Sequence, residues 1–337
     1  METPIADTET KKKIFSAIQP SGMLTLGNFL GALKNWVAMQ EEYDCTYAVA
    51  DLHAITVRQE PAKLKAQILE TFAILLAIGL EPHKCLMFIQ SQVCTHAEMA
   101  WLLNCYTQFG ELARMTQFKD KSGKHPENIN AGLFSYPALM AGDILLYQAD
   151  LVPVGADQKQ HLEISRTIAE RFNGIYGNVF TIPDPYISKI GAKVMSLQEP
   201  TKKMSKSDSN SNSWVAILDK PEDIMKKFKR AVTDSEAKVY FGDGKDGINN
   251  LMTIYSSVSG LAMEQIEGEF AGKGYGDFKV AVGEAVVEAL RPVRERFEEL
   301  IKDKAYLESL YKDGAERAFR VSSRTLAKAK KKIGFVL

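Results

Sequence analysis

The chain has 337 residues, of which 45% are hydrophobic and 25% charged, a composition typical of a soluble globular protein with one large or two medium domains. Lysine plus arginine and aspartate plus glutamate count 42 each, so no overall field draws the protein to nucleic acid or to a membrane, and any polyanion site must be a local patch. The four cysteines form no C-x-x-C pair and no apolar run is long enough to span a bilayer. We therefore expect a cytoplasmic protein with reduced thiols and without a structural metal or iron–sulfur cluster.

The first two thirds of the chain alternate short apolar runs with helical patterns. After a loose tail over residues 1–12, the run IFSAI precedes a helical pattern that begins at Phe29. TYAVADLHAITV and KCLMFIQS are each followed by another helical pattern, KLKAQILETFAILLAIG and HAEMAWLLNCYTQFGEL. This alternation predicts an α/β fold, a Rossmann-like parallel sheet with crossover helices. Ligands of such sheets bind beyond the carboxyl ends of the strands, which directs attention to IQPSG, the turn from Asp51 to His53, and VPVGADQ.

Two polar stretches interrupt the later part of the chain. KDKSGKHPENIN predicts a loop before the apolar helix YPALMAGDILLY, and EPTKKMSKSDSNSNS precedes a segment that is helical from Pro221 to the end. We predict a Rossmann-like domain over residues 13–207 and a helical domain over 208–337, and leave open whether the last helix packs back on the first domain. That helix carries a basic stripe, which is either a solvated face or a contact for RNA phosphates: Arg317, Arg320, Arg324, Lys328 and Lys331.

The stretch PSGMLTLGN lies between the first predicted strand and helix. A crossover needs turn residues and a cap, and Pro20, Gly27 and Asn28 would serve as these. The alternative is an anion site, because a glycine at a helix N-terminus lets a phosphate approach free backbone N–H groups. The stretch alone leaves both interpretations open.

The stretch KMSKS, from Lys203 to Ser207, is far more specific than a glycine turn. On this motif the chain resembles the class I aminoacyl-tRNA synthetases, in which a HIGH-like element follows the first strand. Thr25-Leu26-Gly27-Asn28 stands at that place, with Thr and Asn where the family has histidines. The resemblance implies that Thr25, Asn28, Lys203 and Lys206 are catalytic, the lysines closing over the β and γ phosphates of ATP. A solvated basic linker is the alternative for KMSKS, and Lys121 in the preceding polar loop is either a further phosphate contact or a surface residue.

SAIQPSG, YPALMAGDILLYQAD and VPVGADQKQH, in this order, resemble the bacterial tryptophanyl-tRNA synthetases over most of the chain. The resemblance implies an ATP site formed by Gln19, Pro20, Ser21, Gly27, Asn28, Lys121, Gly155, Ala156, Asp157, Gln158, Val194, Lys203, Met204, Ser205, Lys206 and Ser207. It also implies a tryptophan site formed by Phe15, His53, Tyr136, Met140, Asp143, Ile144, Val152, Val154 and Gln158.

Asp143 is the most informative of these residues, because it is an acid within an apolar helix and a buried acid needs a partner. By the resemblance Asp143 accepts a hydrogen bond from the indole N–H; otherwise it is a structural acid paired with an arginine or a backbone N–H. His83, His96, His125 and His161 have no metal-ligand spacing and are interpreted as surface or core residues. Ala17 stands where the family often has glycine, and its methyl group is expected to change substrate affinity modestly.

The resemblance therefore implies an enzyme that activates L-tryptophan with ATP and transfers it to the 3′ end of its cognate tRNA. Magnesium would arrive with ATP, the helical domain would contact the anticodon, and the protein would be a homodimer. Three alternatives remain: a tyrosine-specific relative, a regulatory paralogue without catalysis, and an amino-acid-activating enzyme that does not charge tRNA.

Overall fold

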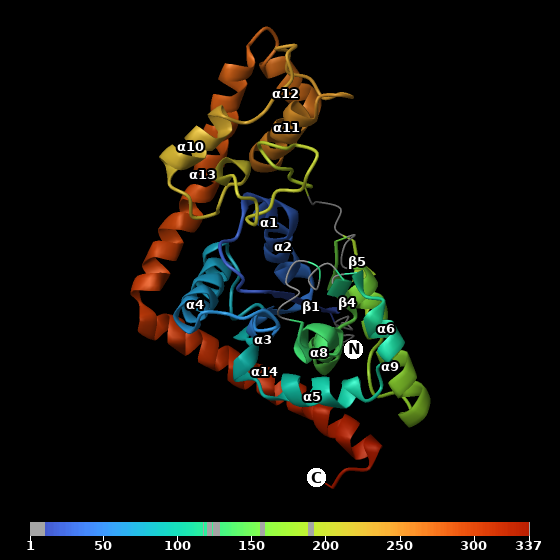
Figure 1. Ribbon diagram of the computed structural model, residues 1–337. Helices are drawn as coiled ribbons and strands as arrows, with labels where there is room; N and C mark the ends of the chain where they lie inside the picture. The colour runs from blue at the N-terminus through green and yellow to red at the C-terminus, as the bar shows by residue number, and fades with distance from the viewer. Residues whose placement is uncertain are drawn as a thin grey trace, which may run out of the picture.

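The chain folds around a five-stranded parallel sheet (Figure 1). The computed structural model describes residues 11–116, 118–119, 123, 129–155, 159–187 and 192–336. The strands run in the order β3-β2-β1-β4-β5 and are β1 (Lys13–Ile18), β2 (Asp44–Val49), β3 (Leu86–Ile89), β4 (Leu151–Pro153) and β5 (Asp184–Tyr186). The predicted Rossmann-like α/β fold is confirmed. The short strand β5, with proline at its centre, lies at the edge of the sheet and was not foreseen in the sequence.

The chain reverses its direction of travel across the sheet at β1. From β1 the chain first builds outward through β2 and β3, and later returns to add β4 on the other side of β1. Such a reversal leaves a crevice outside the carboxyl ends of the two central strands, because the connections from β1 and β4 depart to opposite sides.

Both faces of the sheet are buried, and alternate residues along each strand enter different cores. Ile14, Met87 and Ile89 belong to the core that extends toward the C-terminal helices. Phe15 and Phe88, their neighbours in sequence, belong to a second core on the opposite face. This two-sided burial explains why the strands are continuous apolar runs in the sequence.

Helices cover both faces. Those of the first part are α1 (Leu26–Asn28), continued by a π-helical turn (Phe29–Leu33), α2 (Lys34–Glu42), α3 (Asp51–Ala54), α4 (Pro61–Ala77), α5 (Thr95–Asn104), α6 (Phe109–Ala113), α8 (Ala131–Leu146) and α9 (Lys159–Tyr176). The helix expected from Phe29 thus begins three residues earlier, at a cap formed by Thr25. The helical pattern expected over residues 96–112 is divided into α5 and α6.

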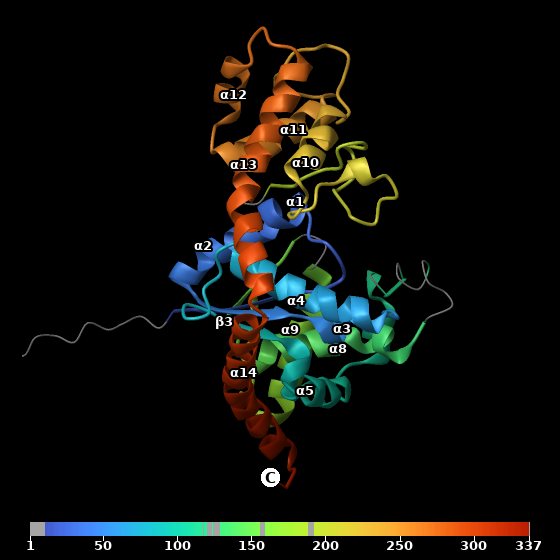
Figure 2. The same cartoon turned by 90° about the vertical axis from the view of Figure 1, so that its left-hand side faces the viewer.

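The C-terminal part is helical, as predicted. It contains α10 (Pro221–Lys229), α11 (Asp246–Ser259), α12 (Met263–Glu269), α13 (Tyr275–Lys302) and α14 (Lys304–Ile333). Figure 2 shows α10, α11, α12 and the start of α13 forming a separate upper body, from which α13 descends beside α4. The predicted domain boundary near residue 207 stays a prediction. Among the residues described, no helix is both long enough and apolar enough to cross a bilayer.

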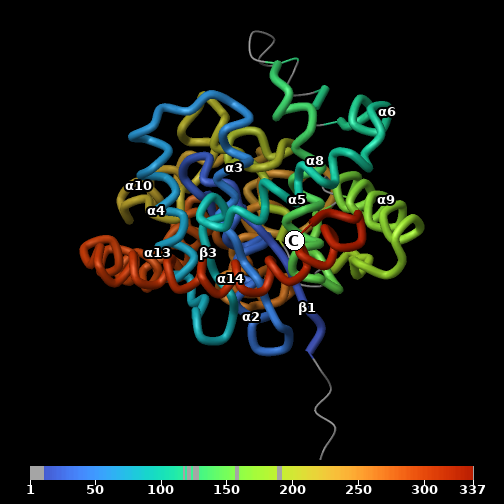
Figure 3. Tube along the Cα trace, turned by 90° about the horizontal axis from the view of Figure 1, so that it is seen from below, coloured from blue at the N-terminus to red at the C-terminus, as the bar shows by residue number. Residues whose placement is uncertain are grey.

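Helix α14 turns away from the upper body and lies across the first domain, against β3, α5 and α8 (Figure 3). It lies so close to β3 that a Cβ atom placed on Gly314 would be 1.7 Å from the carbonyl oxygen of Met87. Arg317, the first residue of the predicted basic stripe, donates to the carbonyl oxygen of Pro82 at 2.7 Å. Arg320 and Arg324 are exposed. Lys328 likewise donates to the carbonyl oxygen of Val179 at 3.2 Å. Two members of the stripe, Arg317 and Lys328, are therefore committed to contacts within the fold.

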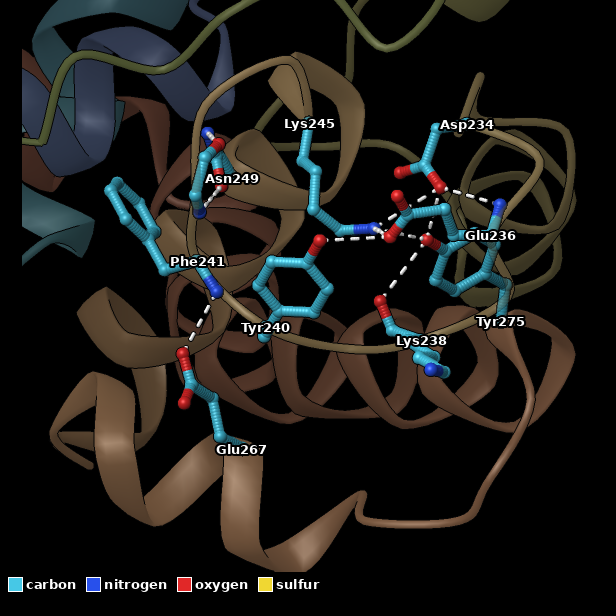
Figure 4. Close-up of polar contacts among 10 residues, drawn as sticks. Asp234, Glu236, Lys238, Tyr240, Phe241, Lys245, Asn249, Glu267 and Tyr275 are labelled. Carbon is cyan, nitrogen blue, oxygen red and sulfur yellow. Dashed lines mark hydrogen bonds and ion pairs between the residues drawn. The ribbon is translucent and has the colours of Figure 1, made fainter.

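In the upper body a buried lysine anchors an irregular segment, residues 234–245 (Figure 4). Lys245 is only 3% exposed, and its Nζ lies 3.0 Å from Glu236 Oε2, 3.2 Å from Asp234 Oδ1 and 2.9 Å from the hydroxyl of Tyr275 on α13. Tyr240 donates its hydroxyl to the same Glu236 carboxylate at 2.8 Å. A buried ammonium group needs such partners, and here they hold the segment against α13.

Candidate active site

A cavity of about 400 Å³ opens at the carboxyl ends of β1, β2 and β4. This volume is in the range of small-molecule sites. Its lining includes all eight described residues of the predicted tryptophan site: Phe15, His53, Tyr136, Met140, Asp143, Ile144, Val152 and Val154. Ser16, Ala17, Gln19, Ala50, Pro153 and His161 complete the lining. The structure thus brings together side chains that are spread over about 140 positions of the sequence, and Gln19, predicted for the ATP site, borders the same cavity.

Asp143 is the buried acid of this cavity. It is 2% exposed, and its carboxylate accepts three hydrogen bonds: from His53 Nε2 to Oδ2 at 2.7 Å, from His96 Nδ1 to Oδ1 at 2.6 Å, and from Gln90 Nε2 to Oδ1 at 2.6 Å. Burial alone would raise the pKa of this carboxyl group, but the hydrogen bonds from the two histidines outweigh burial and lower the pKa to about 2. The group is therefore a carboxylate at neutral pH. Its partners are neither an arginine nor the backbone N–H considered above.

A close helix crossing makes the Asp143 contacts possible. Helix α5 packs against α8 beside Gly142, where an added Cβ would lie 3.3 Å from the backbone nitrogen of Ala100. His96, on the first turn of α5, is thereby brought to Asp143, and its Nε2 lies 2.8 Å from the hydroxyl of Tyr147. The sequence contained no sign that His96 and Gln90 would meet Asp143, because the three residues come from three different elements.

His161 was also interpreted as an ordinary histidine, yet it lines the cavity. It is 1% exposed on α9, and its Nε2 lies 2.5 Å from the hydroxyl of Tyr136. Burial raises the pKa of the Tyr136 phenol, so this hydroxyl stays protonated at neutral pH. A feature that could have pointed to His161 is its position in the GADQKQH segment, three residues after residues 155–158, which are predicted for the ATP site.

The HIGH-like element forms a tight turn at the start of α1. Thr25 caps this helix, and a capping box joins it to Asn28: the Thr25 backbone N–H and hydroxyl both donate to Asn28 Oδ1, at 2.9 and 3.0 Å. The Asn28 backbone N–H donates to Thr25 Oγ1 at 3.3 Å. Thr25 is buried and Asn28 is exposed, so the box holds the Asn28 side chain at the surface of the turn.

The HIGH-like turn and KMSKS lie together. A Cβ on Gly27 would be 3.6 Å from Met204 Cβ and 3.7 Å from Val194 Cβ, so these two side chains pack directly over the glycine. Met204 N–H also donates to the carbonyl oxygen of Val194 at 3.1 Å. Gly27, Val194 and Met204, all predicted for the ATP site, therefore form one contact.

Lys206 connects KMSKS to the residues after β1. Its ammonium group donates to the Ser21 carbonyl oxygen, and lies 3.2 Å from Ser21 Oγ. Partial burial lowers the pKa of this ammonium group. Lys203 is exposed, and Ser205 and Ser207 share a 2.7 Å hydrogen bond between their hydroxyls. One lysine of the motif is thus bound to the PSG turn and the other is free to meet a ligand.

Several predicted residues lie outside the described part of the chain. These are Lys121, Ala156, Asp157 and Gln158, and also His125. Gly155 is described and exposed at the end of the β4 segment, and Pro20 is buried beside Gln19. Within the described ranges there is no group of three histidine, cysteine, aspartate or glutamate residues arranged to hold a metal ion.

The family described as "tRNA synthetases class I (W and Y)" matches residues 7–291. The chain belongs to this family. A relative from Clostridium tetani, a tryptophan–tRNA ligase, is 56% identical over 329 residues, which cover 98% of this chain and 97% of the relative. The predicted resemblance to the bacterial tryptophanyl-tRNA synthetases is therefore confirmed.

Solved structures of this class I tRNA synthetase family have the same fold. The tryptophanyl-tRNA synthetase of Mycoplasma pneumoniae has a TM-score of 0.89 at 36% identity, over 97% of this chain and 99% of that one. The Campylobacter jejuni enzyme, solved in complex with ADP and tryptophan, has a TM-score of 0.83 at 33% identity, over 96% and 100% of the two chains. The likeness spans both the sheet and the C-terminal helices.

Proposed function

We propose that the protein is a tryptophan–tRNA ligase: it activates L-tryptophan with ATP and transfers it to the 3′ end of its cognate tRNA. One observation carries the proposal: the Asp143 carboxylate lies in a cavity with apolar walls. Gln19 borders the same cavity, directly after β1, the strand that leads into the HIGH-like turn. An indole is an apolar ring with a single N–H donor, and this cavity offers apolar walls and one carboxylate acceptor. The names of the Clostridium relative and of the two solved structures support the same activity.

In the first step, a carboxylate oxygen of tryptophan attacks the α-phosphorus of ATP, the bond to the β-phosphate breaks, and pyrophosphate leaves. In the second step, a ribose hydroxyl at the 3′ end of the tRNA attacks the carbonyl carbon of the adenylate, and AMP leaves. Neither step needs a protein nucleophile, so the protein acts by positioning the reactants and by stabilising developing negative charge.

Each predicted catalytic residue has a role in this scheme. We assign Thr25 and Asn28 to the turn that orients the phosphates, with Asn28 held at the surface by the capping box. Lys203 and Lys206 would neutralise the charge of the departing pyrophosphate. For this, the Lys206 ammonium group must give up its hydrogen bonds to Ser21 and donate to phosphate oxygens instead. By the resemblance, Asp157 would accept hydrogen bonds from the ribose hydroxyls of ATP and Gln158 would hold the α-amino group of tryptophan. Both residues lie outside the described part of the chain.

Magnesium is assigned as part of the ATP substrate. Mg²⁺ keeps several water ligands and binds phosphate oxygens readily, so it does not need a protein cage. The two lysines and the Ser21 region provide groups for the phosphates themselves, consistent with a metal that arrives and leaves with the nucleotide.

The test is amino-acid-dependent ATP–pyrophosphate exchange with tryptophan, with tyrosine and without an amino acid. We expect exchange with tryptophan only, and a loss of about a thousandfold in kcat/KM for the combined Lys203→Ala and Lys206→Ala variant, because two charge contacts to the transition state are removed. Ser209→Ala, at an exposed position in the same loop and outside the predicted ATP site, serves as the matched control. Exchange with tyrosine would identify the tyrosine-specific alternative, and no exchange at all would identify the regulatory one.

For tRNA, we propose the surface of the upper body as a contact. Residues 237–240 and 270–274 border a second cavity and include the exposed side chains of Lys238, Tyr240 and Lys273. Phe241, which is also exposed, adjoins them. Unstacked bases bind by stacking on aromatic rings while lysines neutralise phosphates. The buried Lys245 cluster holds this surface in place (Figure 4).

We further propose a cytoplasmic homodimer. Trp101 on α5 and Phe109 on α6 are 69% and 75% exposed, which is unusual for such large apolar side chains. A second copy of the chain would bury them. Sedimentation of the protein at micromolar concentration as a monomer would contradict this assignment.

A further inference from the structure

The hydrogen bonds at Asp143 leave one acceptor position open. An ionised carboxylate presents about four lone-pair positions, two on each oxygen. Oδ1 accepts from both His96 and Gln90, and Oδ2 accepts from His53. Among the described residues no fourth donor reaches the group, so the remaining position is on Oδ2. His53 lines the cavity, whereas His96 and Gln90 do not.

His96 holds Asp143 from behind the cavity. It is completely buried, and both of its ring nitrogens are engaged: Nδ1 at 2.6 Å from Asp143 Oδ1 and Nε2 at 2.8 Å from the hydroxyl of Tyr147. Because the carboxylate is acceptor only, His96 carries its proton on Nδ1. Tyr147 then donates its hydroxyl to Nε2, and burial, the dominant cause, raises the pKa of this phenol, so the donor is retained.

The chain of contacts continues into α14. Ser322 on α14 lies beside the Tyr147 hydroxyl and shares a 2.7 Å hydrogen bond with Thr95, the residue before His96. Among the residues described, the titratable groups around the carboxylate are His53 on α3, His96 on α5, Tyr136 on α8 and Tyr147 directly after α8, with His161 on α9 bonded to Tyr136. No arginine or lysine is among these groups. The buried charge of Asp143 is stabilised mainly by the hydrogen bonds from His53 and His96.

We propose that His96, held by Tyr147, is a positioning residue for amino-acid selection: it occupies Oδ1, keeps Asp143 ionised, and leaves one Oδ2 position for the indole N–H. The inference rests on the proposed role of Asp143 in binding tryptophan. A protonated Asp143 would carry an O–H donor on one oxygen and would be a weaker acceptor for the indole N–H. An ionised Asp143 with an empty acceptor position instead penalises every ligand that lacks an N–H, because the buried oxygen is then left without its partner.

The experiment compares two substrates in ATP–pyrophosphate exchange: L-tryptophan, and the benzothiophene analogue in which sulfur replaces the indole N–H. The readout is the ratio of kcat/KM for the two substrates, which is independent of the fraction of active enzyme. We expect His96→Leu to lower this ratio about ten- to a hundredfold, mainly through a higher KM for tryptophan. That KM should rise further at acid pH in His96→Leu and stay flat in the parent protein, because the carboxyl group has lost a donor.

Three variants serve as controls. His96→Asn places an amide N–H near the position of Nδ1 and is expected to restore the ratio to within about threefold of the parent. Met99→Leu is a buried change on the same helix without a polar contact, and should leave the ratio unchanged. Tyr147→Phe removes the donor to His96 without emptying the His96 site, and should lower the ratio in the same direction as His96→Leu.

The Asp143→Asn variant distinguishes the proposed role of His96 from the proposed role of Asp143 in binding tryptophan. If Asp143→Asn lowers the ratio while His96→Leu and Tyr147→Phe leave it unchanged, the positioning role of His96 is wrong and the role of Asp143 stands. If Asp143→Asn also leaves the ratio unchanged, Asp143 does not recognise the indole, and the site assignment itself is wrong. If His96→Leu does not fold, Tyr147→Phe alone decides the question.

Discussion

At the scale of single residues, the polar groups of the site are hydrogen-bonded to one another before any substrate binds. Thr25 and Asn28 form a closed capping box, and Asp143 is bonded to two histidines and a glutamine. Such preorganisation limits the rearrangement needed when substrate binds, because the polar groups are already held in one orientation. It also means that a single substitution removes more than one contact.

The ionisation of Asp143 leads to a prediction about stability in acid. Its pKa in the folded protein, about 2, is below the value of about 3.9 expected in the unfolded chain, so the ionised group contributes roughly 2 kcal/mol to stability at neutral pH. That contribution is complete above pH 5 and is lost as the pH falls through 4 toward 2. By pH 3 we expect on the order of 1 kcal/mol of it to be gone.

The measurement is the free energy of unfolding in urea at pH 6 and at pH 3, for the parent protein and for Asp143→Asn. The parent protein should lose about 1 kcal/mol more than the variant between these pH values. Asp243→Asn, at an exposed position in the loop before α11, is the control and should behave like the parent. Equal losses in the parent and in Asp143→Asn would mean that the histidine contacts do not stabilise the charged form.

At the scale of elements, close helix contacts determine which side chains meet. The α5–α8 crossing at Gly142 brings His96 to Asp143, and the contact of α14 with β3 at Gly314 fixes the helix that carries Ser322. In both places a glycine allows backbones to approach at distances that a side chain would prevent. The C-terminal helix is thus linked to the buried network behind the amino-acid cavity.

Gly314→Ala should be strongly destabilising. The added Cβ would be 1.7 Å from the Met87 carbonyl oxygen, so α14 must move away from the sheet. We expect a loss of about 3 kcal/mol or more in the free energy of unfolding, because the obstruction is backbone and cannot adopt another rotamer.

Thermal and urea unfolding of Gly314→Ala and of Gly276→Ala measure this effect. Gly276 is near the start of α13 with no atom within 4 Å of an added Cβ, so alanine there should be neutral or stabilising by up to about 1 kcal/mol. If the two variants were equally stable, α14 would not lie against β3 as described.

At the scale of the whole molecule, the chain divides the proposed work between two bodies. The sheet and its helices form one body and α10, α11 and α12 another (Figure 1). The first holds the amino-acid cavity and the predicted ATP motifs, and the second presents exposed aromatic and basic side chains. Helix α13 links them, and α14 returns to the first domain (Figure 2). The basic stripe of α14 therefore lies on the first domain, away from the upper body.

This arrangement allows the two candidate tRNA surfaces to be tested separately. We expect Lys238→Ala combined with Lys273→Ala to weaken tRNA binding about ten- to a hundredfold. The slope of log K against log salt concentration should fall by about two, because two phosphate contacts are lost. The pair Arg320→Ala and Arg324→Ala on α14 should have a smaller effect, because no aromatic cavity adjoins it. Binding measured at several salt concentrations separates the outcomes, with pyrophosphate exchange as the control for an intact active site. A larger loss of tRNA affinity in the Arg320→Ala and Arg324→Ala pair would assign the tRNA contact to the basic stripe of α14.

The sequence alone predicted the fold class from local patterns, because alternating apolar runs and helices predict a parallel sheet. It predicted part of the cavity wall through the resemblance to a known family, which motifs such as KMSKS and GDILLY carry. The eight described residues predicted for the tryptophan site all line one cavity. Only the tertiary structure showed which side chains bond to Asp143 from behind the cavity wall. Gln90 and His96 bond to Asp143, and Tyr147 bonds to His96, because segments distant in sequence pack together there. Histidines that looked ordinary in the sequence thus became partners of the buried acid and of the cavity.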